Sequence, residues 1–140
     1  MKKQKGFTLI ELLVVIAIIG LLSTLAVVAL NNARQKSRDA KRVSDVKQIQ
    51  TALELYYNDA NAYPTTGAVV TGGTITYGDT TYMQIVPSNP SPMADGSCPG
   101  DDYSYVNTSA NTYTLVYCIG GIAGGLDAGT HTATPAGISN

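Results

Sequence analysis

Chemically reactive side chains are few in this sequence. Its 140 residues include two cysteines, Cys98 and Cys118, and one histidine, His131. A Cys–His nucleophile pair is conceivable, but no orienting group or oxyanion motif accompanies it. Two cysteines in a small region rich in Gly, Thr, Ser and Tyr favour one disulfide and an oxidising compartment, with two reduced, half-buried thiols as the alternative. We therefore expect a Cys98–Cys118 disulfide and no enzymatic activity.

Carboxylates are the other groups that could do chemistry. Asp95, Asp101 and Asp102 flank Cys98 in a loop with Gly and Pro, and Asp127 lies in a Gly-rich tail. Oxygen ligands on a flexible loop suit Ca²⁺, which makes these four aspartates candidate calcium ligands. Their spacing matches no ligand loop, and solvated turn aspartates are the default interpretation. We expect no cofactor, with Ca²⁺ as the alternative.

One glutamate lies at the edge of a long apolar segment. Residues 7–30 carry a single charge, on Glu11, and residues 12–30 are uncharged. A helix of residues 12–30 would be about 28 Å long, close to the roughly 30 Å hydrocarbon core of a bilayer. The segment therefore predicts a transmembrane helix. A carboxylate within a bilayer costs about 2.5–3.5 kcal/mol, so Glu11 needs a partner or must reach the interface.

The helix is expected to continue beyond the apolar segment. Apolar residues recur at spacings of three and four and form one stripe: Val43, Val46, Ile49, Leu53, Tyr56 and Tyr57. The other faces carry Arg34, Lys36, Arg38, Asp39, Lys41, Arg42, Asp45 and Lys47. Pro64 and the Asn and Asp residues before it end the helix. One helix therefore runs from Phe7 to about Asn58, and a small domain packs on its apolar stripe.

The remaining residues have the composition of a small β-rich head. Short β-type runs occur at 74–77, 82–86, 103–106 and 113–118, and the last two predict an antiparallel hairpin joined through 107–111. Three prolines mark an irregular connection after residue 86, and the tail after Cys118 is expected to be loop with at most one edge strand. The predicted fold class is α+β, a long N-terminal helix packed on a small antiparallel sheet.

The segment Gly6-Phe7-Thr8-Leu9-Ile10-Glu11 lies between a basic leader and the apolar helix. This arrangement resembles the processing site of type IV pilins and type II secretion pseudopilins. The resemblance continues through Gly20 to residues 52–64, which are similar to the helix end and following loop of major pseudopilins. It divides the chain into a cleaved leader (1–6), a transmembrane and assembly helix (7–30), an amphipathic continuation (31–59) and a disulfide-stapled head (60–140).

The resemblance also implies roles for single residues. A membrane-embedded prepilin peptidase would cut after Gly6, and the new N-terminal residue, Phe7, would be N-methylated. Glu11 would pair with the Phe7 ammonium of a neighbouring subunit during assembly. The family's filaments loosen between a glycine at Gly20 and a proline eight residues later, but this chain has Val28 there. Gly20 is equally well explained as a small residue for close helix packing.

The implied partners are further copies of the same chain, the peptidase, and an inner-membrane assembly platform with a motor ATPase. The precursor would cross the inner membrane once with its N-terminus in the cytoplasm. The subunit would then move to a surface pilus or a periplasmic pseudopilus. Major pseudopilins also hold calcium in their C-terminal loop.

The distribution of charge bears on orientation and on partners. All nine basic residues lie at or before Lys47, and every charged residue beyond it is acidic. The basic tract of residues 34–42 would place its side in the cytoplasm by the positive-inside rule, but the cleavage motif and the cysteines favour the outside. The tract could contact anionic lipid or the acidic heads of neighbouring subunits, or be solvated. Nucleic-acid binding is not expected, because no aromatic residues interleave with the basic ones.

Three functions remain open from the sequence. The first is a type IV pilus subunit, which the two cysteines and the lack of a clear calcium loop favour. The second is a type II secretion pseudopilin, and the third is a membrane-anchored binding domain that never polymerises.

Overall fold

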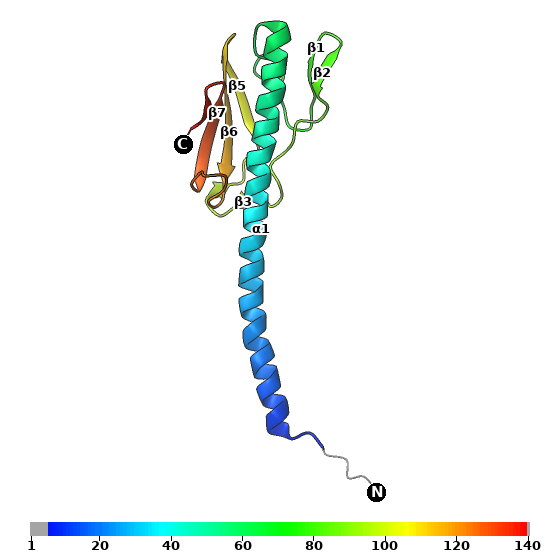
Figure 1. Cartoon of the computed structure of the whole chain (residues 1–140), viewed down its shortest axis with the longest axis vertical. Coiled ribbons are helices and arrows are strands. Elements are labelled where there is room, and N and C mark those ends of the chain that lie inside the picture. The colour runs from blue at the N-terminus through cyan, green and yellow to red at the C-terminus, as the bar shows by residue number, and fades with distance from the viewer. Residues whose placement is uncertain (1–5, 140) are drawn as a thin grey trace. The chain divides into compact units, whose positions relative to one another are not determined.

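The structure, a computed structural model, describes residues 6–139. Of the predicted leader, only Gly6 lies within the described residues. The chain divides into two compact units, Met1–Arg34 and Gln35–Asn140. Helix α1, Leu9–Ala60, contributes to both units (Figure 1).

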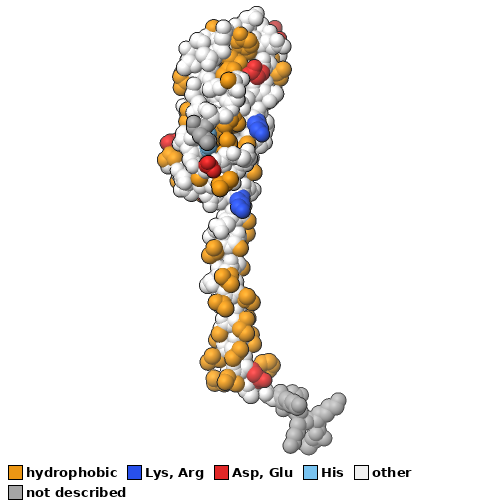
Figure 2. All heavy atoms as spheres, turned by 60° about the vertical axis from the view of Figure 1, so that its left-hand side comes forward, with side chains coloured by type: hydrophobic (Ala, Val, Ile, Leu, Met, Phe, Trp, Pro, Cys, Tyr) orange, Lys and Arg blue, Asp and Glu red, His pale blue; other side chains and the backbone are white. Residues whose placement is uncertain are grey.

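The first unit is an uncovered apolar helix. Helix α1 contains a window with a mean hydropathy of 2.9, long and apolar enough to cross a membrane, and none of that window is buried within the chain. Apolar side chains cover this part of the helix in Figure 2. The hydroxyls of Ser23 and Thr24 donate hydrogen bonds to the carbonyls of Ile19 and Leu21, at 2.7 and 2.8 Å. These polar groups are therefore satisfied within the helix itself, as a lipid environment requires.

The second unit packs a four-stranded sheet and a hairpin against the C-terminal half of α1 (Figure 1). The antiparallel sheet has the order β5-β6-β7-β8. Its strands are β5 Ser104–Ser109, β6 Thr112–Ile119, β7 Gly129–Thr134 and β8 Gly137–Ser139. Two smaller antiparallel pairs complete the unit: β1 Ile75–Tyr77 with β2 Thr80–Met83, and β3 Ala94–Asp95 with β4 Cys98–Pro99. The predicted α+β fold class is confirmed.

Alternation along β6 places its core residues on one face of the sheet. Tyr113, Leu115, Tyr117 and Ile119 are buried and their neighbours are not, which is the pattern of a strand covered on one side. They join the helix stripe in one core cluster. Val43, Val46, Ile49 and Leu53 are buried there, and Tyr56 and Tyr57 pack against it. The predicted apolar stripe of the helix is therefore confirmed.

Three charged residues of the helix are placed differently from the expectation. The sequence pattern placed Asp39, Arg42 and Asp45 on the faces away from the apolar stripe, but all three are buried. Their burial is tolerated because each has polar partners in the head: Asp45, for example, accepts a hydrogen bond from the hydroxyl of Tyr103 at 3.1 Å. The buried face of α1 is thus wider than its apolar stripe.

The strands also differ from the expected runs in particular places. The hairpin between β5 and β6 exists, but its turn is only Ala110–Asn111, shorter than expected. The tail after Cys118 contains two strands, and β7 is an inner strand between β6 and β8. Its sequence, Gly-Thr-His-Thr-Ala-Thr, has no strongly apolar residue. This strand is held by pairing with β6 on one side and β8 on the other. Its own residue composition does not indicate either pairing.

The end of the helix is fixed by Asn61. This residue has a φ of 53°, and its N–H donates to the carbonyl of Tyr57 at 2.8 Å. A left-handed residue directly after the last helical turn is a common helix stop, and Asn tolerates this conformation. The helix therefore ends at Ala60, within the region that the sequence predicted.

Leu53→Ala should lower the free energy of unfolding of the head by about 2–5 kcal/mol, because Leu53 is fully buried in the core cluster. Leu55→Ala is the matched control, since Leu55 is on the same helix but 51% exposed. It should change the free energy by no more than about 0.5 kcal/mol. Denaturant unfolding of the full chain in micelles, followed by near-UV circular dichroism, measures both. An equal loss of unfolding free energy in the two variants would contradict the packing of Leu53 in the core.

Candidate functional site

The candidate assembly residues lie at the start of α1. Gly6, Phe7 and Thr8 precede the helix, and Glu11 is in its first turn. The backbone N–H and the hydroxyl of Thr8 both donate to Glu11 Oε2, at 2.8 and 2.6 Å. The N–H of Glu11 donates back to Thr8 Oγ1 at 3.3 Å. Thr8 and Glu11 therefore form a capping box, in which each residue satisfies a backbone donor of the other.

The capping box uses only one of the two carboxylate oxygens of Glu11. Within residues 6–139, Oε1 accepts no hydrogen bond, whereas Oε2 accepts both from Thr8. A carboxylate has acceptor capacity for more than two donors. The arrangement fixes the orientation of the glutamate and leaves one oxygen for a cation from outside the subunit.

The residues around this carboxylate are open to the surroundings. Phe7 is 83% exposed and Ile10 is 68% exposed. Phe7, Ile10, Glu11, Val14 and Val15 line one shallow apolar groove on the helix surface. An apolar surface with a single carboxylate at its edge is unstable in water and needs lipid or another apolar helix to cover it.

The two cysteines form the predicted disulfide. Cys98 in β4 and Cys118 in β6 are bonded, with their Cα atoms 5.6 Å apart. The bond closes a loop between residues 20 positions apart, which stabilises the fold by about 3 kcal/mol in the chain-entropy model. The N–H of Ser97 also donates to the carbonyl of Gly120 at 3.2 Å. The disulfide therefore ties the irregular segment before β5 to the end of β6.

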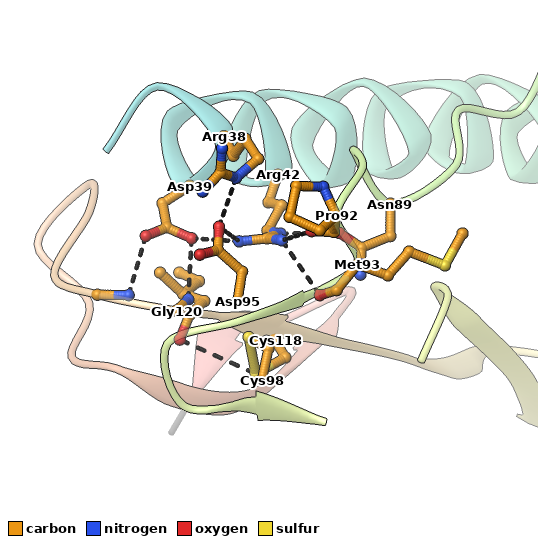
Figure 3. A network of polar contacts seen from close by, with 12 residues as sticks. Arg38, Asp39, Arg42, Asn89, Pro92, Met93, Asp95, Cys98, Cys118 and Gly120 are labelled. Atoms are coloured by element: carbon orange, nitrogen blue, oxygen red, sulfur yellow. Dashed lines mark hydrogen bonds and ion pairs between the residues drawn. A yellow bond between two sulfur atoms is a disulfide. The ribbon is translucent and has the colours of Figure 1, made fainter. Parts of the chain in front are cut away.

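The four candidate calcium ligands do not converge. Asp95 contacts the guanidinium groups of Arg38 and Arg42, at 2.5 and 3.5 Å (Figure 3). Hydrogen bonding to Arg38 and the charges of both arginines hold the pKa of Asp95 below its usual value. Asp102 caps the N–H groups of Asn89 and Tyr103 through one oxygen, and Asp101 and Asp127 are exposed. Among residues 6–139, no group of three or more His, Cys, Asp or Glu side chains could hold a metal ion.

His131 takes part in packing. Its ring lies 5.6 Å from the ring of Tyr117, and its Nε2 is 2.7 Å from the carbonyl oxygen of Asp127. Because both cysteines are in the disulfide, neither is a free thiol. The conceivable Cys–His nucleophile pair therefore does not exist in this structure.

Sequence reasoning missed two residues that organise these sites. Thr8 was detectable, because Thr-x-x-Glu before an apolar run is the signature of a capping box. Arg42 was only partly detectable. Its spacing from Asp39 permits an i, i+3 ion pair, but its other side-chain partners, Asn89 and Asp95, are about fifty residues away.

The sequence of this chain is similar to those of several known proteins. Its residues 1–27 match the family described as the prokaryotic N-terminal methylation motif. The type II secretion system core protein G of Vibrio cholerae serotype O1 is 32% identical over 148 residues, which cover 100% of this chain and 94% of that protein. The proteins of the same name in Aeromonas hydrophila and Escherichia coli K12 are 38% and 36% identical. Those alignments cover 64% and 75% of this chain, and 68% and 73% of the relatives. No solved structure matches the chain significantly.

Thr8→Val should remove the cap and let the first turn of α1 fray, at a cost of about 1 kcal/mol. Thr8→Ser keeps a hydroxyl and should retain most of the cap. Thr24→Val is the matched control, because Thr24 bonds only a carbonyl of its own helix. Hydrogen exchange of the amides of residues 8–11 in micelles measures the effect. Unchanged protection in Thr8→Val would show that the capping box contributes nothing.

Proposed function

This chain belongs to the type II secretion system core protein G family, and from that membership we propose that it is the repeating subunit of a secretion pseudopilus. Its role is structural. The subunit is inserted in the inner membrane and is processed there. It then joins a helical homopolymer through its N-terminal helix. Family membership supports the second of the three functions that the sequence left open, in place of the surface pilus that its cysteines favoured.

The uncovered apolar helix is the observation that carries the proposal. Helix α1 begins with a long apolar stretch that is not buried anywhere within the chain, and its large side chains from Leu9 to Leu30 are all about half or more exposed. Lipid covers such a surface before assembly, and the same helices of neighbouring subunits cover it afterwards. Moving it from lipid to a bundle changes apolar burial little, so subunits can enter and leave the two environments.

Glu11 supplies the specificity that apolar packing lacks. Its Oε2 accepts both hydrogen bonds from Thr8, while Oε1 has no hydrogen-bond partner among the described residues. Cleavage after Gly6 would turn the peptide nitrogen of Phe7 into an ammonium group. In the proposed polymer, Oε1 of one subunit accepts a charge-assisted hydrogen bond from that group on a neighbouring subunit. The pair neutralises both charges and sets the axial register.

The start of α1 suits the processing that the family motif implies. Gly6 and Phe7 lie before the helix begins at Leu9, so the bond between them is in non-helical backbone. A Cβ atom added to Gly6 would contact nothing within 4 Å, which means that the fold itself does not demand a glycine there. We infer that the demand comes from the peptidase, whose cleft must admit the backbone at close range.

The proposed partners and location follow from this role. They are other copies of the chain, the prepilin peptidase and an inner-membrane assembly platform with a motor ATPase. The precursor has its N-terminus in the cytoplasm, and the head lies in the periplasm, where the Cys98–Cys118 disulfide forms. The third function, an anchored domain that never polymerises, does not explain why Glu11 Oε1 has no hydrogen-bond partner among the described residues.

Glu11→Gln should be inserted and processed normally but should fail to assemble. Loss of a hydrogen bond between charged groups is worth about 1.5–3 kcal/mol, which lowers assembly by about tenfold or more at each contact. Glu54→Gln is the matched control, because Glu54 is the only other glutamate and its partner, the hydroxyl of Tyr63, can also bond an amide oxygen. The assay expresses each variant in the native cell after deletion of the gene.

Two quantities are measured in these strains: N-terminal processing by mass spectrometry, and the fraction of a type II-secreted enzyme that reaches the medium. Wild type and Glu54→Gln should restore export, whereas Glu11→Gln should leave the enzyme in the periplasm. Normal export in the deletion strain itself would refute the secretion role. Normal export with Glu11→Gln would leave that role intact and refute the proposed pairing.

A further inference from the structure

A buried guanidinium lies at the centre of a cage of oxygen atoms in the head. Arg42 comes from α1 and has no solvent exposure. Its Nη1 donates to Asp39 Oδ1 at 2.6 Å and to Asp95 Oδ2 at 3.5 Å. Arg38 donates to the same oxygen of Asp95 from the preceding turn of the helix. Two carboxylates therefore face two guanidinium groups, and the formal charge of the cluster is zero.

Neutral oxygens complete the cage. Arg42 Nε donates to Asn89 Oδ1 at 2.8 Å, and its Nη2 donates to the carbonyl oxygens of Pro92 and Met93, both at 3.4 Å. Figure 3 shows these groups pointing at the guanidinium from the segment between β2 and β4. Carboxylates, an amide oxygen and backbone carbonyls are the set of ligands from which proteins build calcium sites. Here the same kinds of oxygen atoms surround the guanidinium of Arg42.

The cage joins the helix to two segments with little regular structure. Asn89, Pro92 and Met93 belong to the connection after β2. On the other side, both oxygens of Asp39 accept hydrogen bonds, from the N–H of Gly120 at 2.8 Å and from that of Gly121 at 2.9 Å. Gly120 begins the connection to β7. One ion pair on α1 thus anchors both connections, and the disulfide separately joins β4 to β6.

Backbone packing beside the cage is tight. A Cβ atom on Gly120 would overlap the carbonyl oxygen of Asp95, and one on Gly96 would overlap the carbonyl oxygen of Gly120. Gly96 also has a φ of 58°, a left-handed conformation that favours glycine. The β3–β4 turn and the start of the connection to β7 therefore touch through their backbones beside the cage.

A divalent cation does not fit this arrangement. A calcium ion would need oxygens at about 2.3–2.6 Å, but the guanidinium of Arg42 already occupies the space between the oxygens of the cage. Adding a divalent cation to this neutral cluster would also leave it with two excess positive charges, which is costly away from water. The remaining candidate ligands are elsewhere: Asp102 caps two N–H groups, while Asp101 and Asp127 are exposed.

We propose that the Arg42 guanidinium, and not a bound divalent cation, holds the two connections of this head in place. The stability of the head is therefore independent of divalent cations and depends on Arg42. This inference concerns the fold of the head and holds whether or not the proposed secretion role is correct.

The first test uses the wild-type full-length chain in detergent micelles. Thermal unfolding is followed by near-UV circular dichroism with excess EGTA and with millimolar calcium chloride. The two melting temperatures should agree within about 2 °C. A resident ion present at about a thousandfold over its Kd would raise the melting temperature by many degrees. A shift of that size in the wild type would overturn the proposal.

The second test removes the guanidinium. Arg42→Ala leaves Asp39 buried without its ionic partner, which should lower the melting temperature by roughly 10 °C. Arg34→Ala is the matched control, since it removes an exposed arginine from the same helix and should shift the melting temperature by no more than about 2 °C. An Arg42→Ala variant as stable as wild type would overturn the proposal.

Arg42→Lys covers the case in which Arg42→Ala does not fold. A lysine keeps the charge but lacks the planar fork that reaches Asp39, Asn89 and the two carbonyls together. It should fold with a melting temperature several degrees below wild type. A melting temperature equal to that of wild type would show that the fork is not what holds the cage, and the proposal would be wrong.

Discussion

The rest of this protein depends on a helix whose first half has no core to join. An apolar segment long enough to cross a membrane is uncovered within the chain, and water is not a tolerable neighbour for it. Lipid and other copies of the same helix are the environments that remain. Because moving the helix from lipid into a bundle of helices changes its apolar burial little, a polar group must distinguish the two environments. Glu11 is the only charged residue available in that segment, and within residues 6–139 its capping bonds to Thr8 leave its second carboxylate oxygen without a donor.

The head is stabilised by separate means. Its apolar core lies between the other half of α1 and one face of the sheet, and the head is small, so the core has limited capacity to fix long connections. Those connections are held by three additional ties: the Cys98–Cys118 disulfide, the Arg42 cage and the contact between Gly96 and Gly120. None of them involves the membrane segment. The fold of the head and the assembly chemistry therefore occupy different residues.

Local sequence patterns predicted the helix, its apolar stripe, the β5–β6 hairpin and the disulfide, because each of these is encoded by residue type and spacing. Strand β7 was not foreseen, because its Thr and Gly residues become a strand only through pairing with β6 and β8. The burial of Arg42 was not foreseen for a similar reason, since a charged residue on a helix is normally solvated. Its Asn89 and Asp95 partners meet it only after folding. The capping role of Thr8, in contrast, was available from the sequence.

The central claim is that Glu11 of one subunit pairs with the N-terminus of another. A cryo-EM reconstruction of filaments isolated from native cells, at a resolution that shows side chains, tests it most directly. We predict a distance of about 2.7–2.9 Å between a carboxylate oxygen of Glu11 and the Phe7 nitrogen of a neighbouring subunit, with the capping bond to Thr8 retained. A map in which every Phe7 nitrogen lies more than about 6 Å from any Glu11 carboxylate would contradict the account.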